Sequence, residues 1–151
     1  MFYTPTHTPT SSSTISRQFR ENPEFYQNST KTDVLVIIDA QVQDCKQLLK
    51  GVVPGVNVKL LNTTQDGVRQ ITQTLRENPN LSEIHILSHG CQGSLQLGNT
   101  QLSLDTLKLY ANELKTWSVS QIMLYGCNVA AGEAGVEFIE KLHQITGAKI
   151  A

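Results

Sequence analysis

Four short apolar segments alternate with helix-like segments along the chain, and this alternation constrains the fold more than any other feature. The first apolar segment, residues 34–38, contains only Val, Leu and Ile, as expected for a strand that is covered on both faces of a parallel sheet. Comparable runs occur at 56–61, 84–87 and 121–124. Parallel strands need crossover connections, which are usually helices. The sequence therefore predicts an α/β fold with a mostly parallel sheet of about five strands and helices on both faces.

Local signals place the helices and a hairpin between these strands. Residues 42–52 have helical spacing, Asp66 is suited to cap a second helix, and Ser103 is suited to cap a third that extends to Leu114. Residues 94–102 alternate in polarity around Gly98-Asn99, which predicts a small β-hairpin.

A fourth helix, with Ala134, Phe138 and Leu142 on one face, is predicted after Cys127 and is closed by Gly147. Residues 148–151 begin a further strand, so we expect a fold that is truncated at the C-terminus.

The chain divides into two regions of different composition. Residues 1–32 are rich in Ser, Thr, Pro and Asn and lack a sustained period, so they predict a flexible leader that buries too little surface to offset its ordering entropy. Residues 33–151 form the predicted α/β domain, because a chain of 151 residues with 39% hydrophobic content can enclose one core.

Composition also excludes several classes of partner. The formal net charge is −1 and no Lys/Arg cluster occurs, so the electrostatic footprint of nucleic-acid binding is missing. The longest apolar run has five residues, far fewer than the roughly 20 that a membrane-spanning helix needs, and no export signal is visible. We therefore expect a soluble chain with no nucleic-acid partner and no membrane insertion.

The three cysteines, Cys45, Cys91 and Cys127, leave at least one thiol free, and their spacing matches no Cys-x-x-Cys motif. The phosphate-binding patterns Gly-Lys-Ser/Thr and Gly-x-Gly-x-x-Gly are also missing. The sequence therefore predicts no metal and no cofactor, and it leaves the cellular compartment open.

Two motifs that carry reactive groups follow predicted strands. Ser88-His89-Gly90 comes directly after the strand at 84–87, and Tyr125-Gly126-Cys127 follows the strand at 121–124. Reactive groups of open α/β sheets collect beyond the carboxyl ends of the strands, so His89 is expected to serve as general acid and base and Cys127 as nucleophile. The N–H groups of Gly90 and Cys127 would stabilise a tetrahedral oxyanion. The alternative is a histidine bonded to backbone and an inert, buried cysteine.

Asp39 and His85 are weaker candidates. Asp39 ends the first strand and is expected to orient the imidazole or to bind a basic group of a substrate, with a turn or cap role as the alternative. His85 and His89 cannot easily share one metal ion, because four residues of extended strand span roughly 13 Å. His85 is instead interpreted as a hydrogen-bonded interior residue.

The motifs in segments 84–90, 95–99 and 124–135 together carry a resemblance. From Val34 to Ala151 the chain resembles the family catalogued as domain of unknown function 4347. Members of that family are often found near the N-terminus of very large bacterial, notably cyanobacterial, surface or secreted proteins, which implies a cell-surface setting within a larger chain.

The arrangement is also similar, more distantly, to caspase-like (clan CD) cysteine peptidases, in which a His-Gly pair and a nucleophilic cysteine follow adjacent central strands. This resemblance implies that His89 is the acid/base, Cys127 the nucleophile, and the N–H groups of Gly90 and Cys127 the oxyanion hole. The leading hypothesis is thiol-dependent cleavage of a peptide, or of the domain's own larger chain. The alternatives are a non-catalytic structural or adhesion module, and a small-molecule hydrolase or transferase.

Overall fold

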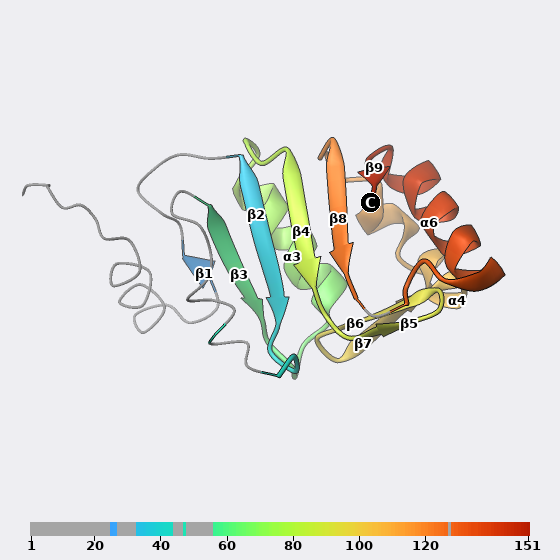
Figure 1. Cartoon of the computed structure of the whole chain (residues 1–151). Coiled ribbons are helices and arrows are strands. Elements are labelled where there is room, and N and C mark those ends of the chain that lie inside the picture. The colour runs from blue at the N-terminus through green and yellow to red at the C-terminus, as the bar shows by residue number, and fades with distance from the viewer. Residues whose placement is uncertain (1–24, 27–32, 44–46, 48–55, 127) are drawn as a thin grey trace, which may run out of the picture.

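The computed structural model describes residues 25–26, 33–43, 47, 56–126 and 128–151 (Figure 1). Its main element is a six-stranded sheet, of which five neighbouring strands run parallel and one edge strand runs antiparallel. In spatial order the strands are β1 (Phe25–Tyr26), β3 (Asn57–Leu61), β2 (Val34–Asp39), β4 (Glu83–Leu87), β8 (Gln121–Tyr125) and β9 (Lys149–Ile150).

The apolar alternation of the central strands produces the core. Leu35, Ile84 and Ile122 are aligned across β2, β4 and β8, and all three are fully buried. Alternate residues of a strand point to the same face, so Ile37 and Ile86 extend this apolar surface in the next row. These side chains belong to one core cluster with buried residues of the helices, and the burial of this shared surface is the main force that holds the layers together.

Two longer helices contribute to that core and have the predicted ends. α3 (Gly67–Glu77) begins where the Asp66 carboxylate accepts a hydrogen bond from the Arg69 N–H at 3.1 Å, as expected for an N-cap. Figure 1 shows α3 lying against one face of the sheet, behind β2 and β4. α6 (Gly132–Thr146) ends at Gly147, which has a left-handed φ of 76°.

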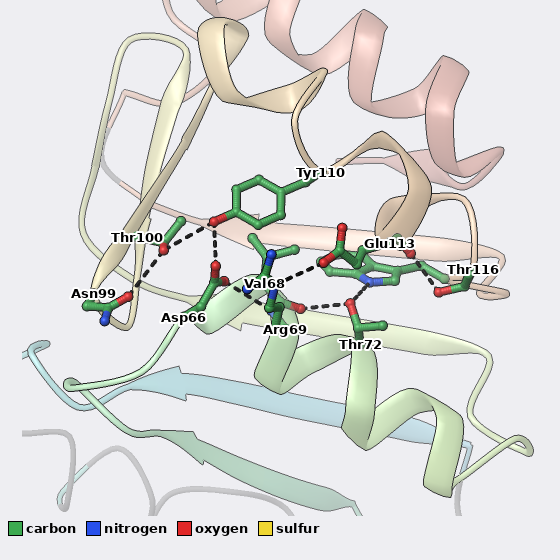
Figure 2. A network of polar contacts seen from close by, with 10 residues as sticks. Asp66, Val68, Arg69, Thr72, Asn99, Thr100, Tyr110, Glu113 and Thr116 are labelled. Carbon is green, nitrogen blue, oxygen red and sulfur yellow. Dashed lines mark hydrogen bonds and ion pairs between the residues drawn. The ribbon is translucent and has the colours of Figure 1, made fainter.

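The helix predicted after Ser103 is two short helices, α4 (Leu104–Leu107) and α5 (Ala111–Leu114). The Ser103 N–H donates to the Thr106 hydroxyl at 2.8 Å, so the predicted start is confirmed. The break falls at Tyr110, whose φ and ψ of −104° and 9° are not helical and whose phenol donates to Asp66 before α3 (Figure 2). The break thus coincides with a contact between residues 44 positions apart. The helical spacing of the apolar residues after Ser103 does not reveal such a break.

A small antiparallel sheet contains β5 (Gly90–Cys91), β6 (Ser94–Leu97) and β7 (Thr100–Ser103). It confirms the predicted hairpin, and Figure 1 shows it beyond the arrowheads of β4 and β8. The turn requires glycine at Gly98, since its φ is +63° and a Cβ there would lie 2.2 Å from the Gln65 carbonyl oxygen. The hairpin turn is therefore pressed onto the loop that precedes α3.

The predicted fold class is confirmed: a mostly parallel sheet with five parallel strands, a small hairpin sheet and helices packed on the main sheet. Phe25 and Tyr26, which the sequence analysis assigns to the leader, form β1 and pair with β3. The helix predicted over 42–52 lies mostly outside the described residues. Among the described helices, none has both the length and the apolar character needed to cross a membrane.

Candidate catalytic site at the carboxyl ends of β4 and β8

The two reactive motifs follow neighbouring strands of the main sheet. β4 and β8 are parallel, and their last paired residues are Leu87 and Tyr125. The two segments stay close after these strands, as shown by Gly126, where an added Cβ would lie 3.4 Å from the Ser88 carbonyl oxygen. His89 follows Ser88, and Cys127 follows Gly126. Cys127 itself lies outside the described residues, and both of its chain neighbours are described.

His89 is exposed, and its ring is held by a backbone carbonyl group. The Nε2 atom of His89 lies 3.1 Å from the carbonyl oxygen of Gln41. A carbonyl oxygen can only accept a hydrogen bond, so Nε2 must carry the hydrogen. In the neutral ring, Nδ1 is then the nitrogen with a free lone pair. The ring is therefore oriented to use Nδ1 as a base.

Gly90 lies on β5, opposite Leu95 of β6. The Gln96 N–H donates to the His89 carbonyl oxygen at 2.9 Å, so residues 89 and 96 form a hydrogen-bonded pair of the antiparallel ladder. In an antiparallel ladder, hydrogen-bonded pairs alternate with pairs that exchange no hydrogen bonds. Gly90 and Leu95, the next pair of the ladder, therefore exchange no hydrogen bonds with each other. The Gly90 N–H is therefore directed away from β6. Its predicted role as an oxyanion donor stays a prediction.

Asp39 is buried, with 1% of its surface exposed, and both carboxylate oxygens accept hydrogen bonds from the backbone. Oδ1 accepts from the Gln41 N–H and Oδ2 from the Gly98 N–H, each at 2.8 Å. Within the described part of the chain, no hydrogen bond joins the Asp39 carboxylate to the His89 ring. The geometry gives Asp39 the turn role that the sequence analysis weighs as its alternative, and substrate recognition by Asp39 stays a prediction.

The remaining histidine and cysteine candidates have identifiable partners. The Nε2 atom of His85 lies 2.8 Å from a Glu83 carboxylate oxygen, and its Nδ1 lies 3.0 Å from the Tyr125 hydroxyl. Both ring nitrogens are thus used, which agrees with a hydrogen-bonded histidine in a strand. Cys91 is exposed, and its Sγ lies 3.0 Å from the Ser94 hydroxyl.

No group of three or more His, Cys, Asp or Glu side chains suited to hold a metal ion occurs in the described segments. A depression of about 430 Å³ lies elsewhere, between α6 and β9 at the edge of the sheet. Its lining is mostly apolar and contains Ala130, Val136, Ile139, Glu140, His143, Lys149 and Ile150.

A second polar network fixes the hairpin against the helices (Figure 2). Tyr110 donates to Asp66 and contacts the Thr100 hydroxyl at 3.3 Å. Burial, followed by the bond to Asp66, raises the pKa of the Tyr110 phenol above its usual value. On the exposed side, Arg69 donates to Glu113 at 3.0 Å, and this hydrogen bond raises the pKa of the guanidinium group further. The network supports the turn of the hairpin that follows His89.

Sequence reasoning missed the contribution of Gln41 and Gly98. Gln41 acts on His89 through its backbone carbonyl, which every residue type carries, so no side-chain pattern reveals it. Gly98 is recognised from the sequence as a turn residue, but its bonds to Asp39 and Gln41 join residues 59 and 57 positions apart, respectively.

The fold and the site together define a class: an α/β domain with a mostly parallel sheet, which presents a histidine beyond the carboxyl end of a central strand. The chain belongs to the family described as "Domain of unknown function (DUF4347)", whose model matches residues 35–151.

Comparison with curated proteins finds no significant match. Among solved structures, the chain is similar to part of an aromatic amino acid aminotransferase with 3-indolepropionic acid. The sequence identity is 13% and the TM-score is 0.39. The matched region covers 93% of this chain and 35% of the aminotransferase chain. A similarity of this size supports no conclusion about activity.

Proposed function

We propose that this domain is a caspase-like cysteine peptidase that cleaves a peptide bond, with its own larger chain as the first substrate. The observation that carries the proposal is the pairing of β4 with β8, because His89 and Cys127 are the second residues after the paired Leu87 and Tyr125. The contact between His89 and the Gln41 carbonyl adds support, since it leaves Nδ1 available as a base.

The proposed reaction is acyl transfer through a thioester. Nδ1 of His89 accepts the proton of the Cys127 thiol, and the sulfur attacks the carbonyl carbon of the scissile peptide bond. The N–H groups of Gly90 and Cys127 donate to the oxyanion that forms. The C–N bond then breaks while the imidazolium gives its proton to the leaving amine. Water, deprotonated by His89, hydrolyses the thioester and restores the thiol.

The Gln41 carbonyl has a defined part in this cycle. It accepts a hydrogen bond from Nε2 in both the neutral ring and the imidazolium, so the ring keeps its orientation while the proton on Nδ1 comes and goes. A partner that also stabilises the positive charge favours formation of the thiolate and imidazolium pair.

The test is self-cleavage of the longest natural chain that contains this domain. Cys127→Ala should abolish cleavage and leave the circular dichroism spectrum unchanged, whereas the matched control Cys91→Ala should cleave at the wild-type rate because Cys91 lies on β5 beside Ser94. Equal processing of wild type and Cys127→Ala would contradict the proposal and favour a non-catalytic module of a large surface protein.

A further inference from the structure

The carbonyl group that holds His89 belongs to a tightly built turn after β2. The Val42 N–H donates to the Asp39 carbonyl oxygen at 3.0 Å, which closes a β-turn. The Gln41 N–H donates to Oδ1 of the Asp39 side chain at 2.8 Å, which is the contact of an Asx turn. The Val42 N–H and the Gln41 carbonyl belong to the same planar peptide group, so the bond from Val42 to Asp39 restricts the direction of the Gln41 carbonyl. The Asx-turn bond fixes the preceding peptide group.

The same turn is attached to the hairpin through Gly98. Oδ2 of Asp39 accepts from the Gly98 N–H at 2.8 Å, and the Gln41 side-chain amide donates to the Gly98 carbonyl oxygen at 2.8 Å. Both backbone polar groups of one residue are thus bound by two residues of the turn. We call this arrangement of Asp39, Gln41 and Gly98 the Gly98 clamp.

Gly98 is itself held firmly, so the clamp has a fixed support. A Cβ at this position would lie 2.2 Å from the Gln65 carbonyl oxygen and 2.9 Å from the Gly67 nitrogen, which shows how closely the turn is packed on the loop before α3. Gly98 also pairs with Asp66 in an isolated β-bridge. The exposed turn that carries the Gln41 carbonyl is therefore connected to the start of a core helix.

We propose that Asp39 and Gln41 are positioning residues that set the tautomer of His89 through the Gly98 clamp. The clamp holds the Gln41 carbonyl 3.1 Å from Nε2 of His89, and this contact keeps the hydrogen on Nε2 and the lone pair on Nδ1. The importance of this tautomer for catalysis rests on the proposed function, whereas the tautomer itself can be measured without any activity.

Gln41→Ala tests the role of the side chain alone, because the substitution removes the side-chain bond to Gly98 and keeps the backbone carbonyl that contacts His89. Gln41 is exposed, so the variant should fold, and its amide NMR spectrum checks this directly. The imidazole ¹⁵N chemical shifts of His89 are then measured as a function of pH, and a His89→Gln variant serves to assign them. Wild type should show the Nε2–H tautomer alone, while in Gln41→Ala the two ¹⁵N shifts should move toward each other as the tautomers mix.

Gln96→Ala is the matched control. Gln96 also donates its side-chain amide to the Gly98 carbonyl oxygen, at 3.1 Å, but it lies on β6 rather than in the turn. Its removal should leave the His89 tautomer as in wild type. Gln41→Lys restores a donor toward Gly98 and should recover the wild-type shifts.

Unchanged His89 shifts in Gln41→Ala, or an equal change in Gln96→Ala, would overturn the inference. All of these measurements can be made in a Cys127→Ala background, which lacks the proposed nucleophile. If the clamp controls the tautomer while the full chain shows no self-cleavage, the positioning role stands and the proposed peptidase activity fails.

Discussion

Removal of the Asp39 carboxylate should destabilise the domain strongly, since this side chain is a structural part of the turn after β2. Asp39 is 1% exposed and accepts two backbone hydrogen bonds at 2.8 Å. Asp39→Ala removes both acceptors and leaves the N–H groups of Gln41 and Gly98 without these partners. An ionised acceptor makes stronger hydrogen bonds than a neutral one.

The expected loss follows from these two bonds. A hydrogen bond to a charged group contributes about 1.5–3 kcal/mol to stability, so the loss of two corresponds to about 3–6 kcal/mol. The native state of a domain is stable by only about 5–15 kcal/mol, so Asp39→Ala should unfold far more easily than wild type. Asp39→Asn keeps one oxygen acceptor and should cost roughly half as much.

The assay is urea denaturation followed by circular dichroism, with the midpoint and slope compared among the variants. Asp105→Ala is the matched control, because Asp105 is an exposed carboxylate in the first turn of α4. Its removal should change the free energy of unfolding by about 0.5 kcal/mol. A loss in Asp39→Ala no larger than in the control would refute the structural role and restore substrate binding as the better interpretation of Asp39.

Two further variants test the hairpin and its polar network. Gly98→Ala should lower the free energy of unfolding by more than about 2 kcal/mol in urea denaturation, because it adds a clash with the Gln65 carbonyl oxygen to the strain of a positive φ. The control Gly147→Ala, at a residue with a φ of 76° and open space around it, should lower the free energy of unfolding by only about 1–2 kcal/mol. Equal losses of stability in the two variants would argue against the close packing of the hairpin turn. Tyr110→Phe should alter how stability depends on pH in the alkaline range. The phenol pKa is raised in the folded state, so the native state holds this proton more tightly than the unfolded state does. The stabilisation from the protonated phenol is therefore present below the unfolded pKa of about 10 and is lost as the pH rises above that value. The stability difference between wild type and Tyr110→Phe should therefore shrink above about pH 10, and a difference that is constant with pH would contradict the assignment.

Local signals were sufficient to predict most of the fold. The apolar run at 34–38 is short, continuous and mostly β-branched, which favours a covered strand. The caps at Asp66 and Gly147 act within one turn of their own helices. β1 could not be predicted, because two aromatic residues gain their strand conformation only from pairing with β3 more than 30 residues later.

In the candidate site, too, local features could be predicted from the sequence and contacts between distant segments could not. His89 is recognisable because its residue type and its place after a strand are both visible in the sequence. The Gln41 carbonyl is not, since its effect depends on a ring 48 residues away. For Asp39 the sequence leaves a turn role and a binding role open, and the backbone hydrogen bonds of its two oxygens support the turn role. Contacts between distant segments thus decide what the residue types leave open.

The proposed reaction requires a chemical partnership between His89 and Cys127, and alkylation tests this partnership directly. The chain with Cys45 and Cys91 replaced by Ser carries Cys127 alone, and its rate of reaction with iodoacetamide is measured from pH 5 to 9, with and without His89→Gln. A neighbouring imidazolium that raises the thiolate fraction about tenfold speeds alkylation about threefold, because the more acidic thiolate is less nucleophilic. We predict at least this loss at pH 7 in the His89→Gln chain. Identical rates and pH profiles in the two chains would contradict the central claim.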